Sequence, residues 1–353
     1  MPVLSVVCRP LAAVCAGVAL LAAGCGSSSS SSSQSTTGSA SSAAASSSST
    51  STTAAGPAPA VNELPTAERP TASQFPSPHG RSLQQMAKLA RSSVNLGAAT
   101  GTFTPGTQRF AFALVTGSGS YVYAPTAVYL STSPGSPASG PYLAPADPTG
   151  VAPQFRSQQN SGPGGLAAIY AAQVPVARPG TYTVLSLTRT AKGLIGAPGE
   201  IAVARSSPIP APGQRPPAIA TDTAATVHGD TALLTTRLPA EHMAAVSLDQ
   251  VLGKRPIALL FSTPQLCVSR VCGPVTDVTV QLQHQFGNRV TFIHQEVYVD
   301  NQPSKGLRPQ LNAFHLRTEP WLFAINRRGI IVARLEGAFG TAELTRALQA
   351  ALR

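Results

Sequence analysis

A proline-dense segment divides this chain of 353 residues into two parts that cannot share one continuous helix or sheet. Five prolines fall between Ser206 and Pro217, at Pro208, Pro210, Pro212, Pro216 and Pro217. Proline has a fixed φ and no backbone N–H, so such a run extends neither a helix nor a central strand. We therefore expect a multidomain chain in which a linker over 206–225 joins two folded regions.

The region before this linker has the short, spaced apolar runs of an all-β domain. Candidate strands are Arg109–Val115, Thr126–Ser131, Ala167–Val174, Thr181–Leu187 and Glu200–Ala204. Turn-forming residues separate them, and the pattern predicts an antiparallel β-sandwich over 81–205. The turn Pro179-Gly180 leading into Thr-Tyr-Thr-Val resembles immunoglobulin-like modules of bacterial exported proteins. Leu83, Met86 and Leu89 have helical spacing, and we expect a short helix that packs on this domain.

The N-terminus has the features of a secretory signal. Arg9 precedes an apolar stretch, Leu11 to Ala23, that is too short to span a bilayer. It ends in Leu21-Ala22-Ala23-Gly24-Cys25, which resembles a bacterial lipobox and predicts a signal peptide over 1–24 with lipid on Cys25. We expect the protein to be lipid-anchored on the extracytoplasmic face of the cell membrane.

A low-complexity segment follows Cys25. Gly26 to Thr53 is almost wholly Ser, Thr, Ala and Gly, and Pro57 to Pro78 is punctuated by proline. Such a composition cannot bury a core, so it predicts a disordered tether over 25–80. About thirty residues of this kind reach on the order of 30 Å.

The charge balance is basic but dispersed. The chain has 25 Lys and Arg against 14 Asp and Glu, a formal net charge of +11, with no basic run. Nucleic-acid binding is therefore not expected. The six histidines show no metal-ligand spacing, and no metal site is predicted from them.

The region after the linker alternates strand and helix patterns. Ile257–Phe261 is an unbroken apolar run, typical of a strand that is covered on both faces. Cys272-Gly273-Pro274 opens a helical pattern, and a further strand, a short helix and a hairpin around Asn326–Gly329 follow. Thr341 is the expected N-cap of a closing helix. The predicted order over 226–353 is β-α-β-α-β-β-α.

Two of the five cysteines remain for the folded protein. Cys8 and Cys15 leave with the signal peptide and Cys25 is the lipid site, so Cys267 and Cys272 are expected to pair in an oxidising compartment. Residues five apart in a continuous α-helix point about 140° apart. Their sulfurs can therefore meet only if the helix begins near Cys272 and Cys267 lies in a loop before it.

These features together resemble the thioredoxin superfamily over about Leu248 to Arg353. The resemblance implies a thioredoxin-like α/β fold, a cis peptide bond at Pro320 beside the dithiol, and thiol–disulfide exchange without a bound cofactor. It also places Trp321 and Glu319 near a substrate, and Arg270 would favour a thiolate. The cysteine spacing is C-x4-C rather than C-x-x-C. Leu260 stands where many members bury a carboxylate, and Glu319 is the candidate replacement.

Three functions follow from this resemblance and its departures. The first is a monomeric thiol–disulfide oxidoreductase that acts on exported proteins, with Cys267 attacking and Cys272 resolving, although the Cys-Gly-Pro match favours the reverse order. The second is copper handling as in Sco-type chaperones, for which soft thiolates suit Cu(I). The matching histidine would fall beside Glu319 or Pro320, and His315 comes one helical turn too early. The third is a non-catalytic binding module with a structural disulfide.

Overall fold

The computed structural model describes residues 62–160 and 165–353. The described residues all lie within one compact unit. The predicted signal peptide, Cys25 and most of the predicted tether lie outside the described residues. Within the described ranges, no helix is both long enough and apolar enough to cross a bilayer.

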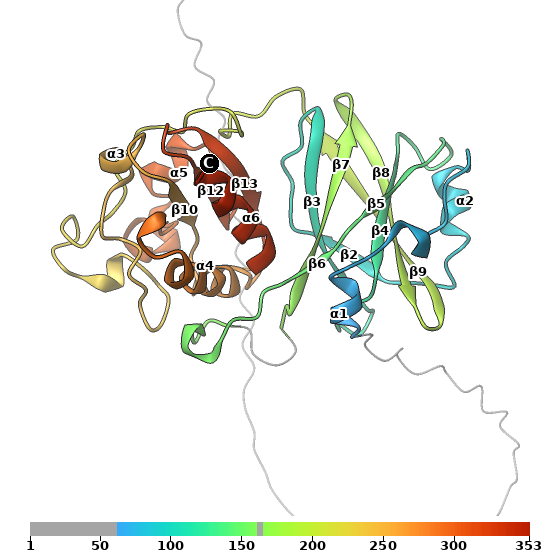
Figure 1. Ribbon diagram of the computed structural model, residues 1–353, viewed down its shortest axis with the longest axis horizontal. Helices are drawn as coiled ribbons and strands as arrows, with labels where there is room; N and C mark the ends of the chain where they lie inside the picture. The colour runs from blue at the N-terminus through green and yellow to red at the C-terminus, as the bar shows by residue number, and fades with distance from the viewer. Residues whose placement is uncertain (1–61, 161–164) are drawn as a thin grey trace, which may run out of the picture. The chain divides into compact units, whose positions relative to one another are not determined.

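The N-terminal part of the described chain is a sandwich of two β-sheets (Figure 1). One sheet has the order β1-β9-β8-β4-β5 and the other β2-β3-β7-β6. All neighbouring strands are antiparallel except the short β1–β9 pair. The strands are β1 (Ser92–Ser93), β2 (Asn95–Ala98), β3 (Gly106–Val115), β4 (Thr126–Ser131), β5 (Ser139–Leu143), β6 (Ala146–Pro148), β7 (Ala168–Val176), β8 (Gly180–Thr190) and β9 (Gly193–Val203).

The alternation of β3 explains how this sandwich contacts the rest of the chain. Phe110 and Phe112 point into the sandwich core, where Phe112 stacks on Tyr170 with ring centroids 5.4 Å apart. Ala111 points to the opposite face and joins a core built mainly by the C-terminal region. Successive side chains of a strand face opposite sides, so one strand contributes to two cores.

The five predicted strands are all present, as β3, β4, β7, β8 and β9. The four strands that the sequence did not predict, β1, β2, β5 and β6, have two to five residues each. They lack the long apolar runs on which strand prediction depends.

The predicted tether extends too far along the chain. Residues 62–80 are folded: they include α1 (Leu64–Ala67), and both Ala67 and Phe75 are buried in the sandwich. The composition did not predict a folded segment here, because a few apolar residues are enough to hold a proline-rich segment against the sandwich. The expected short helix is α2 (Leu83–Ala87), and its Leu83 and Met86 pack on the sandwich as predicted.

The C-terminal part has the predicted order of strands and helices, except that a short helix the sequence did not predict, Leu248–Val251, precedes the first strand. Its sheet has the order β11-β10-β12-β13, with β11 parallel to β10 and the other neighbours antiparallel. The elements are α3 (Leu248–Val251), β10 (Ile257–Phe261), α4 (Cys272–Phe286), β11 (Thr291–Gln295), α5 (Pro309–Ala313), β12 (Trp321–Ile325), β13 (Ile331–Glu336) and α6 (Thr341–Ala351).

Helices cover both faces of this sheet (Figure 1). Leu260 of β10 packs on the side of α4 and α6, whereas Leu259 and Phe261 pack on the side of α3 and α5. Coverage on both faces is the physical reason for the unbroken apolar run of β10.

Two boundary predictions need correction. The segment 206–225 contains no helix or strand, but it is not a free linker: Gly213 and Gln214 exchange backbone hydrogen bonds with Ile331 of β13. The N-cap of α6 is Gly340 rather than Thr341. The carboxylate of Asp147 in the sandwich accepts hydrogen bonds from the N–H groups of Gly340, Ala342 and Glu343. A residue nearly two hundred positions away therefore caps this helix, which no local pattern can indicate.

Candidate functional site

The structure brings Cys267 and Cys272 together in the way that their spacing requires. Helix α4 begins at Cys272, and Cys267 lies before it in a turn where its N–H donates to Thr263 O at 3.1 Å. The two side chains are hydrogen-bonded to each other and are not joined by a disulfide. The pair is therefore in its dithiol form.

Cys267 is the more acidic of the two thiols. The hydrogen bond from Cys272 lowers the pKa of Cys267 to about 6, although burial acts in the opposite direction. Three further hydrogen-bond partners also lower the pKa of Cys267. They are Ser269 Oγ, which lies 3.2 Å from the sulfur, and the backbone N–H groups of Val271 and Cys272. These N–H groups belong to the start of α4, where the unpaired donors of a helix favour negative charge.

Cys272 has the opposite character. Burial, together with the hydrogen bond to Cys267, raises the pKa of the Cys272 thiol well above its ordinary value. Both cysteines are buried, but Cys272 is 0% exposed and Cys267 is 6% exposed, so of the two only Cys267 keeps any exposed area. The arrangement pairs an acidic thiol that keeps a small exposed area with a protonated thiol that is completely buried.

The loop before β12 completes the surroundings of the dithiol. The Glu319–Pro320 peptide bond is cis, which confirms the expectation for Pro320. Burial and the negative charge of Cys267 raise the pKa of Glu319. Tyr298 also lies near this site, which the sequence did not indicate. Burial raises the pKa of Tyr298, and the charges of Glu319 and both cysteines act in the same direction.

The expectation that Trp321 faces a substrate is wrong. Its side chain is 1% exposed, stacks on Phe323 with centroids 6.2 Å apart, and donates from Nε1 to Thr318 Oγ1 at 3.1 Å. Trp321 begins β12, and the alternation of that strand directs the ring into the core. Arg270 is exposed, with φ at 57° in the turn between the cysteines.

A mainly apolar groove of about 440 Å³ lies beside this site. One wall comes from the C-terminal part and includes Ser269, Val271 and Glu319. The other comes from the sandwich and includes Tyr121, Ile169 and residues at the end of β2. The sequence did not indicate that the sandwich borders the site, because contacts between residues so far apart leave no local pattern.

Two glycines allow the sandwich to approach the site closely. A Cβ at Gly273, in the first turn of α4, would lie 2.2 Å from Gln159 O, and a Cβ at Gly337 would lie 1.9 Å from Ala99 O. The buried Asp277 of α4 strengthens the first contact, since it pairs with Arg237 at 2.9 Å and accepts from Ser157 N. The sandwich is thus fixed against the helix that carries Cys272.

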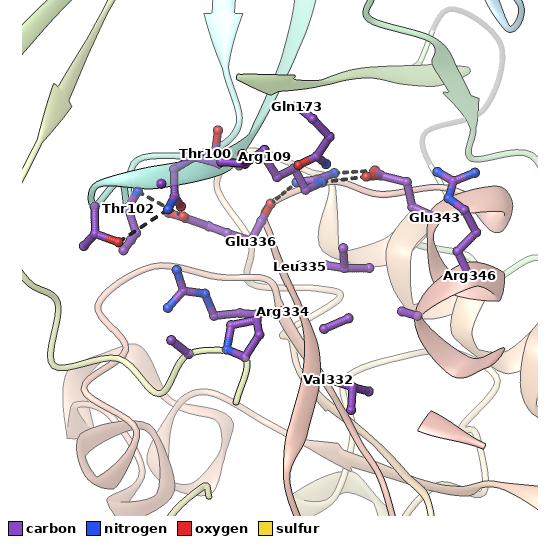
Figure 2. Close-up of a pocket in the computed structure, with 18 of the residues that line it drawn as sticks. Thr100, Thr102, Arg109, Gln173, Val332, Arg334, Leu335, Glu336, Glu343 and Arg346 are labelled. Atoms are coloured by element: carbon purple, nitrogen blue, oxygen red, sulfur yellow. Dashed lines mark hydrogen bonds and ion pairs between the residues drawn. The ribbon is translucent and has the colours of Figure 1, made fainter. Parts of the chain in front are cut away.

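A larger cavity, of about 610 Å³, has a different composition (Figure 2). Arg109 of β3 spans it to reach Glu343 of α6, at 2.6 and 2.8 Å, and donates to the carbonyl oxygens of Glu336 and Ala338. Neither cysteine lines this cavity. Its polar groups hold the sandwich to α6 and β13.

No group of three or more His, Cys, Asp and Glu side chains that could hold a metal ion occurs in the described part of the chain. His315, the histidine considered for a copper site, is exposed. Nothing in the described structure therefore adds a third ligand to the two cysteines.

No family model matches the chain, and no curated protein matches it. A similar solved structure is that of a thiol:disulfide interchange protein, DsbE, from Chlorobium tepidum, at 15% identity and a TM-score of 0.29. The match covers 41% of this chain and 99% of that chain.

Proposed function

We propose that this protein is an extracytoplasmic thiol–disulfide oxidoreductase of the thioredoxin superfamily, anchored to the membrane as a monomer through lipid on Cys25. The observation that carries the proposal is the unequal dithiol: Cys267 keeps a small exposed area and has its pKa lowered to about 6, and it accepts a hydrogen bond from the buried Cys272. A permanent structural disulfide has no need of such an asymmetry. Thiolate, not thiol, is the reactive form of cysteine.

The proposed reaction has two steps. The Cys267 thiolate attacks one sulfur of a partner disulfide, forming a mixed disulfide and releasing the partner's other sulfur as a thiolate. Cys272 then loses its proton and attacks Cys267. The mixed disulfide breaks, the partner leaves fully reduced, and Cys267 and Cys272 are joined. The reverse sequence oxidises a partner dithiol.

The surroundings of Cys267 suit a polypeptide partner. Val268, its immediate neighbour, is 94% exposed, and the groove beside the site is lined mainly by apolar atoms and small residues. An exposed apolar side chain next to a reactive sulfur offers contact area to a chain that carries a cysteine. Exported proteins with thiols or disulfides are the proposed partners.

Glu319 is the proposed proton acceptor for Cys272. Its negative charge contributes to raising the pKa of Cys272, so the two groups interact electrostatically. Burial and Cys267 raise the pKa of Glu319, so it holds a proton more readily than an ordinary glutamate does. A group with this property can take the proton that Cys272 must lose.

Reduction of insulin disulfides by residues 55–353, with dithiothreitol as the electron source, tests the proposal. We expect Cys267→Ser to abolish the acceleration, since it removes the attacking sulfur. Cys272→Ser should accumulate the mixed disulfide, which is detectable as a mass adduct on Cys267. Equal rates for the original chain and both variants would refute the proposal.

The reduction potential of the pair separates an exchange site from a structural disulfide. Equilibration with glutathione or dithiothreitol buffers should give a potential well above about −300 mV, because a stabilised thiolate favours the reduced form. A value far below that figure would support the structural alternative.

A further inference from the structure

A buried chain of hydrogen bonds connects a histidine–glutamate pair to the dithiol. His294 of β11 is the register partner of Leu260 of β10, and its Nδ1 lies 2.5 Å from Glu241 Oε1. The side chains of His294 and Glu241 are 1% and 3% exposed. The mechanism proposed above does not use either residue, and neither belongs to the groove.

The partners of His294 define its protonation state. Nε2 lies 3.0 Å from the carbonyl oxygen of Ser262, which can only accept, so this nitrogen carries a hydrogen. Nδ1 faces a carboxylate, which accepts from it. With both nitrogens donating, the ring is an imidazolium. Burial acts to lower the pKa of His294, but the charge and hydrogen bond of Glu241 outweigh it and raise that pKa.

The charged groups around His294 come from two segments. Glu241 precedes α3 and Glu296 follows β11, and both act to raise the pKa of His294. In return, the charge of His294 and its hydrogen bond lower the pKa of Glu241 even though burial opposes this. The residue after β10, Ser262, contacts His294 through its uncharged hydroxyl, and that hydroxyl is in turn hydrogen-bonded to the hydroxyl of Thr276 in α4. Each member of the pair therefore favours the ionised form of the other.

Two routes lead from His294 to Cys272. The carbonyl of Ser262 and the N–H of Thr263 belong to one peptide group, and that N–H is hydrogen-bonded to Cys272. The second route runs through hydroxyls: His294 Nε2 is 2.9 Å from Ser262 Oγ, which is 2.8 Å from Thr276 Oγ1, and Thr276 donates to Cys272 O. Hydrogen bonds in series polarise one another.

We propose that His294 and Glu241 are positioning residues that hold a positive charge against the Ser262–Thr263 peptide group and thereby stabilise the thiolate-bearing, reduced form of the dithiol. A cation on the carbonyl strengthens the N–H at the other side of the same peptide group. That N–H acts on Cys272, whose S–H in turn acts on the Cys267 thiolate.

The proposed redox consequence follows from the half-reaction. The Cys267–Cys272 disulfide takes up two electrons and one proton, giving the Cys267 thiolate and the Cys272 thiol. Stabilising the thiolate raises the reduction potential of the pair and makes the disulfide a stronger oxidant. This inference rests on the proposed function, because the reduction potential of the pair matters only if the dithiol exchanges electrons with a partner.

The test compares three variants of residues 55–353 with the original sequence. His294→Gln keeps an N–H donor for Ser262 without the charge. Glu241→Gln keeps a polar partner for His294 without the carboxylate that keeps the ring charged. His242→Gln is the matched control, because His242 is the exposed neighbour of Glu241. For each variant, the alkylation rate of Cys267 is measured from pH 4 to 10, together with the reduction potential.

We expect both His294→Gln and Glu241→Gln to raise the alkylation midpoint of Cys267 by roughly 0.5 unit and to make the reduction potential more negative. At pH 6 the alkylation rate should fall about twofold, and the control should match the original chain. If one variant fails to fold, as judged by its near-ultraviolet circular dichroism, the other still decides the question. A folded variant with an unchanged midpoint and potential would overturn the inference.

Failure of the proposed function is distinguishable from failure of this inference. The thiol titration requires no partner protein, so a shift in either variant would support the inference even if insulin is not reduced. Conversely, insulin reduction that depends on both cysteines, combined with unshifted titrations, would uphold the function and refute the role of His294.

Discussion

Two neighbouring regions of the molecule use buried charge in different ways. Where the sandwich meets α6, Arg109 makes two hydrogen bonds to Glu343 and two to backbone carbonyls, and Asp147 accepts from three N–H groups. Around the dithiol, Glu319 makes no hydrogen bond to another described residue, and its pKa is raised by burial and by Cys267. Arg109 and Asp147, whose charges are fully hydrogen-bonded, hold the two parts of the fold together. Glu319 and the two thiols have fewer hydrogen-bond partners, and they can exchange protons and electrons.

The largest expected effect is a loss of stability from a substitution where the sandwich meets α6, with no change at the dithiol. Arg109→Ala leaves Glu343, which is 7% exposed, without its partner, and breaking a buried ion pair costs about 3–5 kcal/mol. We expect the free energy of unfolding, measured by denaturant titration, to fall by about that amount. Arg346→Ala is the control, since this exposed residue lines the same cavity as Arg109, and it should change stability by less than about 0.5 kcal/mol.

The comparison fails if the alkylation midpoint of Cys267 shifts in folded Arg109→Ala. Such a shift would mean that the ion pair tunes the thiols as well as joining the two parts of the fold.

The second effect concerns the dithiol itself. Because the pKa of Cys267 is lowered to about 6, its thiolate fraction should rise as pH increases through 6, and its alkylation rate should level off above pH 7. Cys272→Ala removes the strongest donor to this thiolate and should move the midpoint upward, toward about 8.5 for an ordinary cysteine. Cys272→Ser keeps a donor, so its midpoint should lie below that of Cys272→Ala. Identical midpoints in all three proteins would show that Cys272 does not stabilise the thiolate.

The smallest expected effect distinguishes the role of Glu319 in proton transfer from the reactivity of the thiols. Glu319→Gln removes the proposed proton acceptor, so insulin reduction at pH 7 should fall roughly tenfold. The alkylation rate of Cys267 at pH 7 should not fall, because no hydrogen bond to Cys267 is lost. The pKa of Glu319 is raised, so its carboxylate should titrate on the acid side of the pH profile for insulin reduction. In Glu319→Gln that ionisation should be missing from the profile. An unchanged profile would exclude Glu319 from proton transfer.

The sequence predicted the elements that depend on local patterns. The apolar run of β10, the Cys-Gly-Pro start of α4 and the hairpin of β12 and β13 each have a signal within a few residues. The cis bond at Pro320 followed from the family resemblance. Trp321 was misplaced because the resemblance gives its position along the chain, whereas the alternation of β12 determines which way the ring points.

The sequence by itself determined that two sulfurs had to meet where a helix begins, because C-x4-C permits contact only if Cys267 lies in a loop. Tertiary structure alone decided which sulfur is acidic, since burial and the donors of α4 and Ser269 act unequally on the pair. It also brought His294, Glu241 and the groove wall of the sandwich to the site. Local patterns report short-range preferences of the backbone, whereas the acidity of a thiol depends on charges and donors that only folding brings within reach.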